Sequence, residues 1–415
     1  MSGTTPADHS AHRDGNATES RFRPFATDRV VAGSDGQIAL QALVAAAREH
    51  VEQADRECVV GQPVIDAMIE SGLFSLLRPD PERGPADLLG FFTAVRALAG
   101  AAPSAGWVAG MLGAAAWHID SMAPAVRQEV WGSTPHALVT ASHAPTGRLA
   151  PGDGGYLLQG EWPNLPAYDH CEWVALAALT TSTETKPVGL ATVVVPRAEL
   201  SAGERWNTTG LRGTGSRRVT ARRVFVPAHR VHTTPRAAST IPKGRARERC
   251  PLAIVYGLAA CMPVLGAVQG AFEDHLYRAG RRAALSLAGA RAVSDPVVQA
   301  AVARGLGELD ASVLQLERDA REAISTAASG MPLAPELRLR TRRDQVRAIE
   351  RALAALEMLR RAAGADAVRA DSTLDRAWRD VQTAAAHLVN QPEPALRLYG
   401  QWAFGLEVLD EMVIV

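Results

Sequence analysis

Two histidines in apolar surroundings are the side chains of this sequence best suited to proton transfer. His118 follows Trp117 after a run of alanines, and His387 lies among alanines in a stretch, 373–390, that we expect to be helical. Because histidine titrates near neutral pH, either imidazole could accept a proton from a substrate. From the residues alone, a core histidine with satisfied hydrogen bonds is the commoner interpretation of such a position.

The other histidines and the cysteines give no sign of a metal centre. The eleven histidines contain no His-Glu-x-x-His pattern and no spacing with a carboxylate that indicates metal ligands, so no metal is expected. His229 and His232 flank a loop after the last expected strand, and we interpret both as surface residues. The four cysteines lie far apart, without a Cys-x-x-Cys pair, which is typical of reduced thiols in a cytosolic protein.

A glycine-rich segment, Thr209-Gly-Leu-Arg-Gly-Thr-Gly-Ser216, gathers small hydrogen-bond donors in one place. Gly210, Gly213 and Gly215 would allow backbone amides to turn toward a ligand, and Thr214 and Ser216 would add hydroxyl groups. Such a segment suits a ligand with a polar edge or a phosphate. A plain turn between strands is the alternative.

The elements that must position these residues change in type twice along the chain. Apolar residues at helical spacing predict helices near 40–54, 63–72, 87–99 and 104–122. Short runs bounded by Gly, Pro, Asp and Thr predict strands at 137–142, 156–160, 173–179, 190–195 and 219–226. After Pro242 the helical spacing returns in long helices through 302–316 and 346–356, as in an antiparallel bundle.

Length and charge limit the possible functions. The 415 residues exceed what one compact core usually holds, so two or three packed units are expected. The 44 basic residues balance 44 acidic ones, which excludes a net charge that would attract nucleic acid or an acidic membrane. The sequence contains no uninterrupted run of about 18 apolar residues, so no membrane span is predicted. The first 36 residues are polar and are expected to be a disordered leader without a secretory signal, so we expect a cytoplasmic protein.

This order of elements, together with several local motifs, resembles the acyl-CoA dehydrogenase fold. The closer resemblance is to its monooxygenase branch, the two-component flavin-dependent (group D) hydroxylases. The motifs are Ser142-His-Ala-Pro-Thr-Gly147, Gly160-Glu-Trp162, Asp169-His-Cys-Glu-Trp173, the segment 209–216, and Arg376-Ala-Trp-Arg-Asp380 followed by His387. The resemblance covers almost the whole chain after about residue 37. It implies an α+β fold with an N-terminal helical domain at 37–132, a middle β-domain at 133–232 and a C-terminal long-helix bundle at 233–415.

The resemblance also implies where a flavin would bind. The candidate cofactor-binding residues are Ser142, Thr146, Trp162, Asn164, Arg212, Gly213, Thr214, Ser216 and Arg278. Trp162 would lie beside the flavin ring, and arginines near Arg278 meet flavin phosphates in related proteins, often across a subunit boundary. One departure concerns the loop after the tryptophan, where relatives usually carry Ser-Gly and this chain reads Trp162-Pro-Asn-Leu-Pro-Ala167. Asn164 is the candidate replacement for the missing donor.

The implied activity is hydroxylation of a small aromatic or natural-product intermediate with O2. Reduced FAD or FMN would come from a partner flavin reductase, His387 would act as the base or orient the substrate, and His118 would be a second polar contact. A homotetramer is expected, with the flavin site near a subunit boundary.

Two other functions stay open on the same fold. An acyl-CoA dehydrogenase needs a carboxylate base, and the stretch 398–402, Leu-Tyr-Gly-Gln-Trp, lacks the glutamate that many relatives carry there. The second is an enzyme of the same fold that does not insert oxygen, or a non-catalytic binding protein, and the altered loop at 163–167 motivates it; a sugar N-oxygenase is a further variant on this fold.

Overall fold

The computed structural model describes residues 34–78, 86–181, 187–234, 250–281, 294–369 and 372–408. The expected leader therefore lies almost wholly outside the described residues, and helix is already present from Ser34. Five helices come first: α1 (Ser34–Glu57), α2 (Gln62–Glu70), α3 (Leu88–Ala101), α4 (Pro103–Asp120) and α5 (Pro124–Trp131). Pro63, Pro103 and Pro124 stand in the first turns of α2, α4 and α5, where the missing N–H of proline costs nothing.

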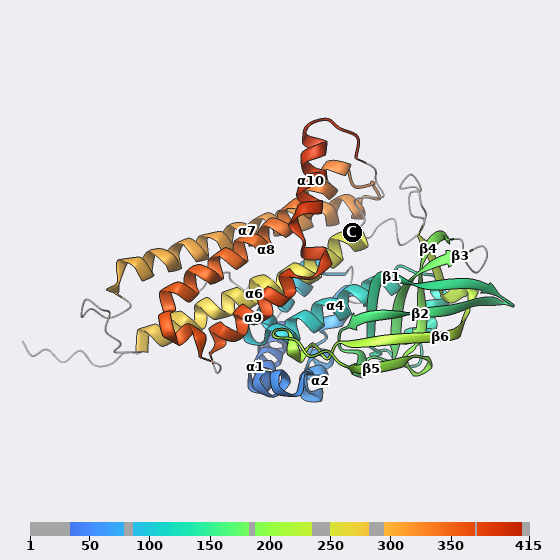
Figure 1. Ribbon diagram of the computed structural model, residues 1–415, viewed down its shortest axis with the longest axis horizontal. Coiled ribbons are helices and arrows are strands. Elements are labelled where there is room, and N and C mark those ends of the chain that lie inside the picture. Colours follow the sequence, from blue (N-terminus) through green and yellow to red (C-terminus); the bar gives the residue numbers. More distant parts are fainter. Residues whose placement is uncertain are drawn as a thin grey trace, which may run out of the picture.

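The middle of the chain forms one seven-stranded sheet (Figure 1). Its strands are β1 (Val139–Gly152), β2 (Gly155–Leu165), β3 (Trp173–Thr181), β4 (Pro187–Pro196), β5 (Ser201–Arg205), β6 (Arg217–Pro227) and β7 (Val231–Thr234). The strand order is β5-β6-β2-β1-β3-β4-β7, and only β1 and β3 pair in parallel. The register of β1 against β3 shifts between Ser142 and Gly147, so residues 143–146 bulge out of the ladder.

Helices return after the sheet and form the long bundle seen in Figure 1. They are α6 (Leu252–Arg281), α7 (Pro296–Ala328), α8 (Pro335–Ala363), α9 (Thr373–Ala385) and α10 (Pro392–Ala403). The predicted order of helices, sheet and helices is confirmed. The short elements α5, β5 and β7 were not predicted, because none of them carries a long apolar pattern and every residue of β5 is exposed.

Helix α6 is the central element of the helical core. It packs against α3, α4, α8 and α9, and its approach to α3 depends on glycine. A Cβ atom at Gly270 would lie 2.0 Å from the carbonyl oxygen of Gly100, so the two backbones nearly touch. By length and composition α6 could cross a membrane, but 78% of its most apolar window is buried inside the protein. Helix α4 packs against both α6 and β1, and it thereby links the bundle to the sheet.

Candidate active site

Aromatic rings from four parts of the chain meet where α4, β1 and α6 come together. Between ring centroids, His118 on α4 lies 5.7 Å from His143 on β1, and His143 lies 4.6 Å from Tyr256 on α6. Tyr256 lies 6.1 Å from His387, which is 5.6 Å from Trp107 on α4. These five residues are called the histidine cluster below. The structure thus brings the two predicted histidines, His118 and His387, into one group.

Trp107 and His118, the two members of the cluster on α4, are buried, whereas the other three members keep some accessible surface. Trp107 is 6% exposed and His118 is 8% exposed, and His143, Tyr256 and His387 are partly exposed. These last three residues keep a small accessible fraction, although Nε2 of His143 is itself buried.

His387 does not lie within a helix, and the expectation of one helix over 373–390 is wrong at its C-terminal end. Helix α9 ends at Ala385, and His387 has extended backbone angles (φ −65°, ψ 138°) before a short 3-10 turn, Leu388–Asn390. The side-chain amide of Asn390 donates to the carbonyl oxygen of Ala384 at 2.8 Å, which also accepts from the backbone N–H of His387 at 3.1 Å. The break turns the imidazole toward Tyr256 and Trp107.

The kink also determines which nitrogen of His387 carries its proton. The backbone N–H of Val389 donates to Nδ1 of His387 at 3.3 Å, so Nδ1 acts as an acceptor. In a neutral imidazole the proton then resides on Nε2. His387 is accordingly arranged as a hydrogen-bond donor, which fits the orienting role expected for it better than the role of base.

All three histidines of the cluster are neutral at pH 7. Burial lowers the pKa of His118 to about 3, with a further contribution from His143 and His232. Burial also lowers the pKa of His143 to about 4, helped by His387, and that of His387 to about 4, helped by Arg342. Burial raises the pKa of Tyr256 to about 12, so its hydroxyl stays protonated. Each charge would repel the next, so the cluster favours at most one extra proton at a time.

Two nitrogen atoms of the cluster are buried without a hydrogen-bond partner in the protein. They are Nδ1 of His118 and Nε2 of His143. A buried polar atom left unpaired costs about 1–3 kcal/mol, so such atoms in a native site usually meet a ligand or an ordered water. The cluster therefore offers unpaired imidazole nitrogens to a ligand beside an aromatic surface.

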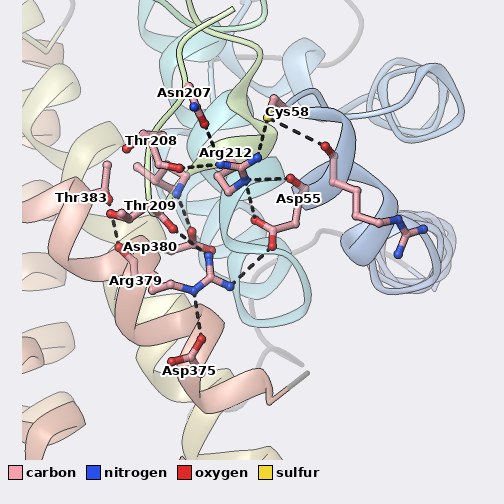
Figure 2. A network of polar contacts seen from close by, with 12 residues as sticks. Asp55, Cys58, Asn207, Thr208, Thr209, Arg212, Asp375, Arg379, Asp380 and Thr383 are labelled. Carbon is pink, nitrogen blue, oxygen red and sulfur yellow. Dashed lines mark hydrogen bonds and ion pairs between the residues drawn. The ribbon is translucent and has the colours of Figure 1, made fainter. Parts of the chain in front are cut away.

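The glycine-rich segment 209–216 is held between α1 and α9 by a polar network (Figure 2). Arg212 donates to the carbonyl oxygen of Asp55 at 3.0 Å and to Sγ of Cys58 at 3.1 Å. Its remaining nitrogen donates to Oδ1 of Asn207 at 3.1 Å and to the carbonyl oxygen of Thr208 at 2.8 Å. Every nitrogen of Arg212 is thus engaged within the protein, which argues against the expected flavin contact.

The α9 side of this network fixes the start of the segment. Arg379 donates to the carbonyl oxygen of Thr209 at 2.7 Å and pairs with Asp55 at 3.5 Å. Asp380 accepts a hydrogen bond from the backbone N–H of Leu211. Figure 2 shows these contacts joining three segments that are far apart in the sequence. We refer to the contacts of Arg212, Arg379 and Asp380 as the clamp.

The small residues of the segment pack inward and do not face a ligand. Thr214 is 1% exposed and Ser216 is 3% exposed, and their hydroxyls lie 2.9 Å apart in a mutual hydrogen bond. A Cβ atom at Gly213 would lie 3.0 Å from Cβ of Ser104 and 3.1 Å from Cβ of Ala54. The expectation that the side chains of Thr214 and Ser216 contact a flavin does not fit this geometry, because close packing against α1 and α4 accounts for the small residues.

Asp380 provides a stability prediction. Burial, strengthened by the nearby Asp55, raises its pKa from 3.8 to about 7. Because the folded state holds this proton more tightly, the free energy of unfolding should fall as pH rises from about 4 to 7. Asp380→Asn keeps an acceptor for Leu211 but cannot ionise, so we expect it to be more stable than the parent at pH 8 by about 1–3 kcal/mol. The advantage should shrink below pH 4. Urea unfolding across pH measures this, and parallel curves for the two proteins would contradict it.

The remaining flavin candidates divide into reachable and unreachable positions. Trp162 is fully buried in the core of the sheet, and its Nε1 donates to the carbonyl oxygen of Ala177 at 2.8 Å. It was expected beside the flavin ring, and this position does not fit, because no surface of its side chain is accessible. Arg278 pairs with Asp274 on the same helix at 2.8 Å. It lies twenty-two residues beyond Tyr256, about 33 Å along α6, and so is not part of the histidine cluster.

Ser142, Thr146 and Asn164 are the reachable candidates. Ser142 is partly exposed at the start of the β1 bulge, and Thr146 is exposed at its end, with its hydroxyl donating to the carbonyl oxygen of Glu161 at 2.6 Å. Asn164 is exposed in a second bulge, on β2, with a left-handed backbone (φ 57°) that asparagine tolerates. A flavin ring has a polar edge that such groups and the unpaired cluster nitrogens can satisfy. The unpaired nitrogens of the cluster, next to Ser142 at the start of the β1 bulge, are the groups here that could meet the polar edge of a flavin.

Three residues of the histidine cluster (Trp107, His143 and Tyr256) and the neighbouring His232 were not singled out from the sequence. His143 stands inside the quoted motif but was not singled out, and its place in a bulge breaks the alternation by which its direction could be read. Tyr256 is one of only five tyrosines and interrupts the apolar pattern of α6. His232 was interpreted as a surface residue, yet its ring lies 6.0 Å from that of His118.

Comparisons with known proteins agree with this geometry. The family model "Acyl-CoA dehydrogenase, C-terminal domain" matches residues 258–392. The chain is 32% identical over 380 residues to HsaA, the oxygenase subunit of a flavin-dependent monooxygenase from Rhodococcus jostii (strain RHA1), covering 90% of this chain and 99% of that protein. It is 31% identical over 324 residues to the oxygenase component of an FADH2-dependent resorcinol hydroxylase from Rhizobium sp. (strain MTP-10005), covering 75% and 79%. The structure of XiaF from Streptomyces sp. in complex with FADH2 and glycerol is similar with a TM-score of 0.84 and 26% identity, covering 92% of this chain and 97% of that one.

The fold and the site therefore define a flavoenzyme of the acyl-CoA dehydrogenase-like class. Within that class, the chain belongs to the oxygenase subunits of two-component flavin-dependent monooxygenases. Both the predicted fold class and the predicted branch are confirmed. An oxygenase of this kind takes reduced flavin from a partner reductase and uses O2 as its co-substrate.

Proposed function

We propose that this protein hydroxylates a small aromatic compound that carries a phenolic hydroxyl group. The observation that carries the proposal is the histidine cluster, in which one imidazole is set as a donor and two others have unpaired nitrogens. A phenol presents one oxygen that can accept from the donor and one proton that an unpaired nitrogen can take. The resemblance to a resorcinol hydroxylase supports the same substrate class.

Each residue of the cluster has a distinct part in this proposal. Nε2–H of His387 donates to the substrate oxygen and stabilises the phenolate that makes the ring nucleophilic, and His118 or His143 receives the proton. Trp107 and Tyr256 form an apolar surface for the ring. The chemistry supplied by a bound reduced flavin is the two-electron activation of O2, one atom of which enters the substrate while the other leaves as water. Ser142, Thr146 and Asn164 would hold reduced FAD or FMN, and the buried α4 side of the site limits access of water.

An acyl-CoA dehydrogenase activity has less support. That reaction needs a carboxylate base, and none of the five residues of the histidine cluster is a carboxylate. The stretch 398–402 lies on α10, where Tyr399 and Trp402 contact each other at 5.5 Å.

An anaerobic titration tests the proposed function. Purified protein is titrated with chemically reduced FMN and FAD, and then oxygen and a panel of simple phenols are added. We expect tight binding of the reduced flavin and a product that contains one atom of isotopically labelled O2. Bleaching of bound oxidised FAD by an acyl-CoA would instead support a dehydrogenase, and no affinity for flavin in either redox state would refute both activities.

We also propose a cytoplasmic homotetramer with the flavin site near a subunit boundary. Phe404 is 87% exposed and Leu406 is 59% exposed just after α10, which projects from the bundle in Figure 1. Exposed apolar residues at the end of a projecting helix are suited to contact with a second copy. The double variant Phe404→Ser, Leu406→Ser should sediment as a smaller species than the parent in analytical ultracentrifugation. Unchanged sedimentation would remove these residues from the interface.

A further inference from the structure

The row of rings does not end at the histidine cluster but continues to the edge of the sheet. His232 on β7, the last strand in the sheet order, has its ring centroid 6.0 Å from that of His118, with the two rings nearly perpendicular. His118 is 8% exposed, whereas His232 is partly exposed. A series of imidazoles therefore runs from His143, through His118, to a side chain that solvent reaches.

This arrangement is unsuited to a metal and does not hold a charge in place. No group of three His, Cys, Asp or Glu side chains that could bind a metal ion occurs in the described parts of the chain. His229 and Arg230, which come just before His232 in the chain, both contact Glu129, at 3.0 and 2.7 Å. Arg342 opposes a proton on His387, and Tyr256 stays un-ionised. A proton placed on His118 or His143 therefore has no described carboxylate partner that would retain it.

The unpaired nitrogens supply the second observation. Nδ1 of His118 and Nε2 of His143 are buried without a partner, and both need a polar atom from a substrate or a water. Because both atoms are buried, bulk solvent does not contact them directly. His232, whose ring lies next to that of His118 and which is partly exposed, offers them a connection to solvent.

We propose that His232 is the outer end of a proton path that connects the substrate hydroxyl with solvent through His118. The inference rests on the proposed function. In the first step, the O–H bond of the phenol breaks, its electron pair stays on oxygen, and an unpaired nitrogen of His118 or His143 gains the proton. The proton then passes through water to His232 and on to bulk solvent, so every imidazole ends neutral and no oxidation or reduction takes place.

The test follows the proton on a bound phenol without requiring turnover. The probe is 4-nitrophenol, whose phenolate absorbs visible light, bound to the full-length protein and followed by stopped-flow pH jump. His232→Ala should slow the change in protonation of the bound probe by about tenfold or more, and added imidazole should restore it. His232→Gln fills the same space but cannot titrate, and it should be equally slow. His229→Ala, a change at a neighbouring histidine paired with Glu129, should match the parent protein.

Each result has a defined meaning. A parental rate in both His232 variants would overturn the path, as would a slow rate that imidazole fails to restore, because that result indicates a structural effect. Failure of the parent protein to bind 4-nitrophenol would overturn the phenol site and the path together. A further combination is that the parent protein exchanges the proton quickly and the His232→Ala variant only with added imidazole, while the parent hydroxylates no phenol. That combination would overturn the proposed function and leave the path in place.

Discussion

Replacing His387 with alanine should lower the rate of phenol hydroxylation by about 10²–10³-fold, the loss expected when one pre-oriented donor to a developing oxyanion is removed. The kink after α9 and the Val389 N–H hold the imidazole as an Nε2–H donor, so no rearrangement is needed when the phenolate forms. The affinity for reduced flavin should change little, because Ser142, Thr146 and Asn164 lie on other elements. Single-turnover product formation and anaerobic flavin titration measure the two quantities.

His387→Gln distinguishes a donor from a base at this position. Glutamine keeps an N–H donor but cannot accept a proton at neutral pH, so partial recovery relative to His387→Ala supports the donor role. Equal loss in both variants would show that His387 acts as the base. The acid limb of the parent pH–rate profile should lie near pH 4, not near 6.5, because burial depresses the pKa values of His143 and His387 to about 4. His229→Ala is the matched control for loss of a histidine.

Gly210→Ala should be the most damaging small substitution in the glycine-rich segment. A Cβ atom there would lie 2.0 Å from the carbonyl oxygen of Arg379, and a backbone atom cannot move aside as a flexible side chain can. Overpacking of this kind costs about 1–3 kcal/mol, and displacement of the segment would also break the bond from Leu211 to Asp380. Urea denaturation at pH 7 measures the loss.

A matched glycine elsewhere separates packing from general effects of the substitution. Gly307 is exposed within α7, and nothing lies within 4 Å of a Cβ atom added to it. Gly307→Ala should therefore stabilise the protein by about 0.5–1 kcal/mol, since alanine favours helix over glycine. If Gly210→Ala left the free energy of unfolding unchanged or raised it, as expected for Gly307→Ala, the close contact with α9 would not be important for stability.

The sequence predicted the elements that carry strong periodic patterns and missed those that depend on distant contacts. Long apolar stripes predicted α4 and the bundle, and short runs bounded by turn residues, several of them rich in valine, predicted five of the strands. The break at His387 could not be read locally, because the alanines before it favour helix and the stabilising contacts of Asn390 reach back to Ala384 and across to Ala260.

The candidate site was predicted only in part for a similar reason. His118 and His387 were both singled out and lie in one group of rings, but spacing along the chain gives no sign that β1, α6 and β7 bring His143, Tyr256 and His232 to them. The glycine-rich segment shows the opposite error. Small residues beside an arginine suggest a ligand cradle, and the same composition serves equally well where a loop must fit tightly between two helices.

The clamp limits which segments of the protein can move. Arg212 and Arg379 tie the segment 209–216 to both α1 and α9, and Asp380 fastens it once more from α9. Several bonds would have to break together before this segment could move away from either helix. The segment 209–216 therefore holds α1 and α9 at a fixed spacing, and any movement that admits a ligand to the histidine cluster must come from other segments of the molecule.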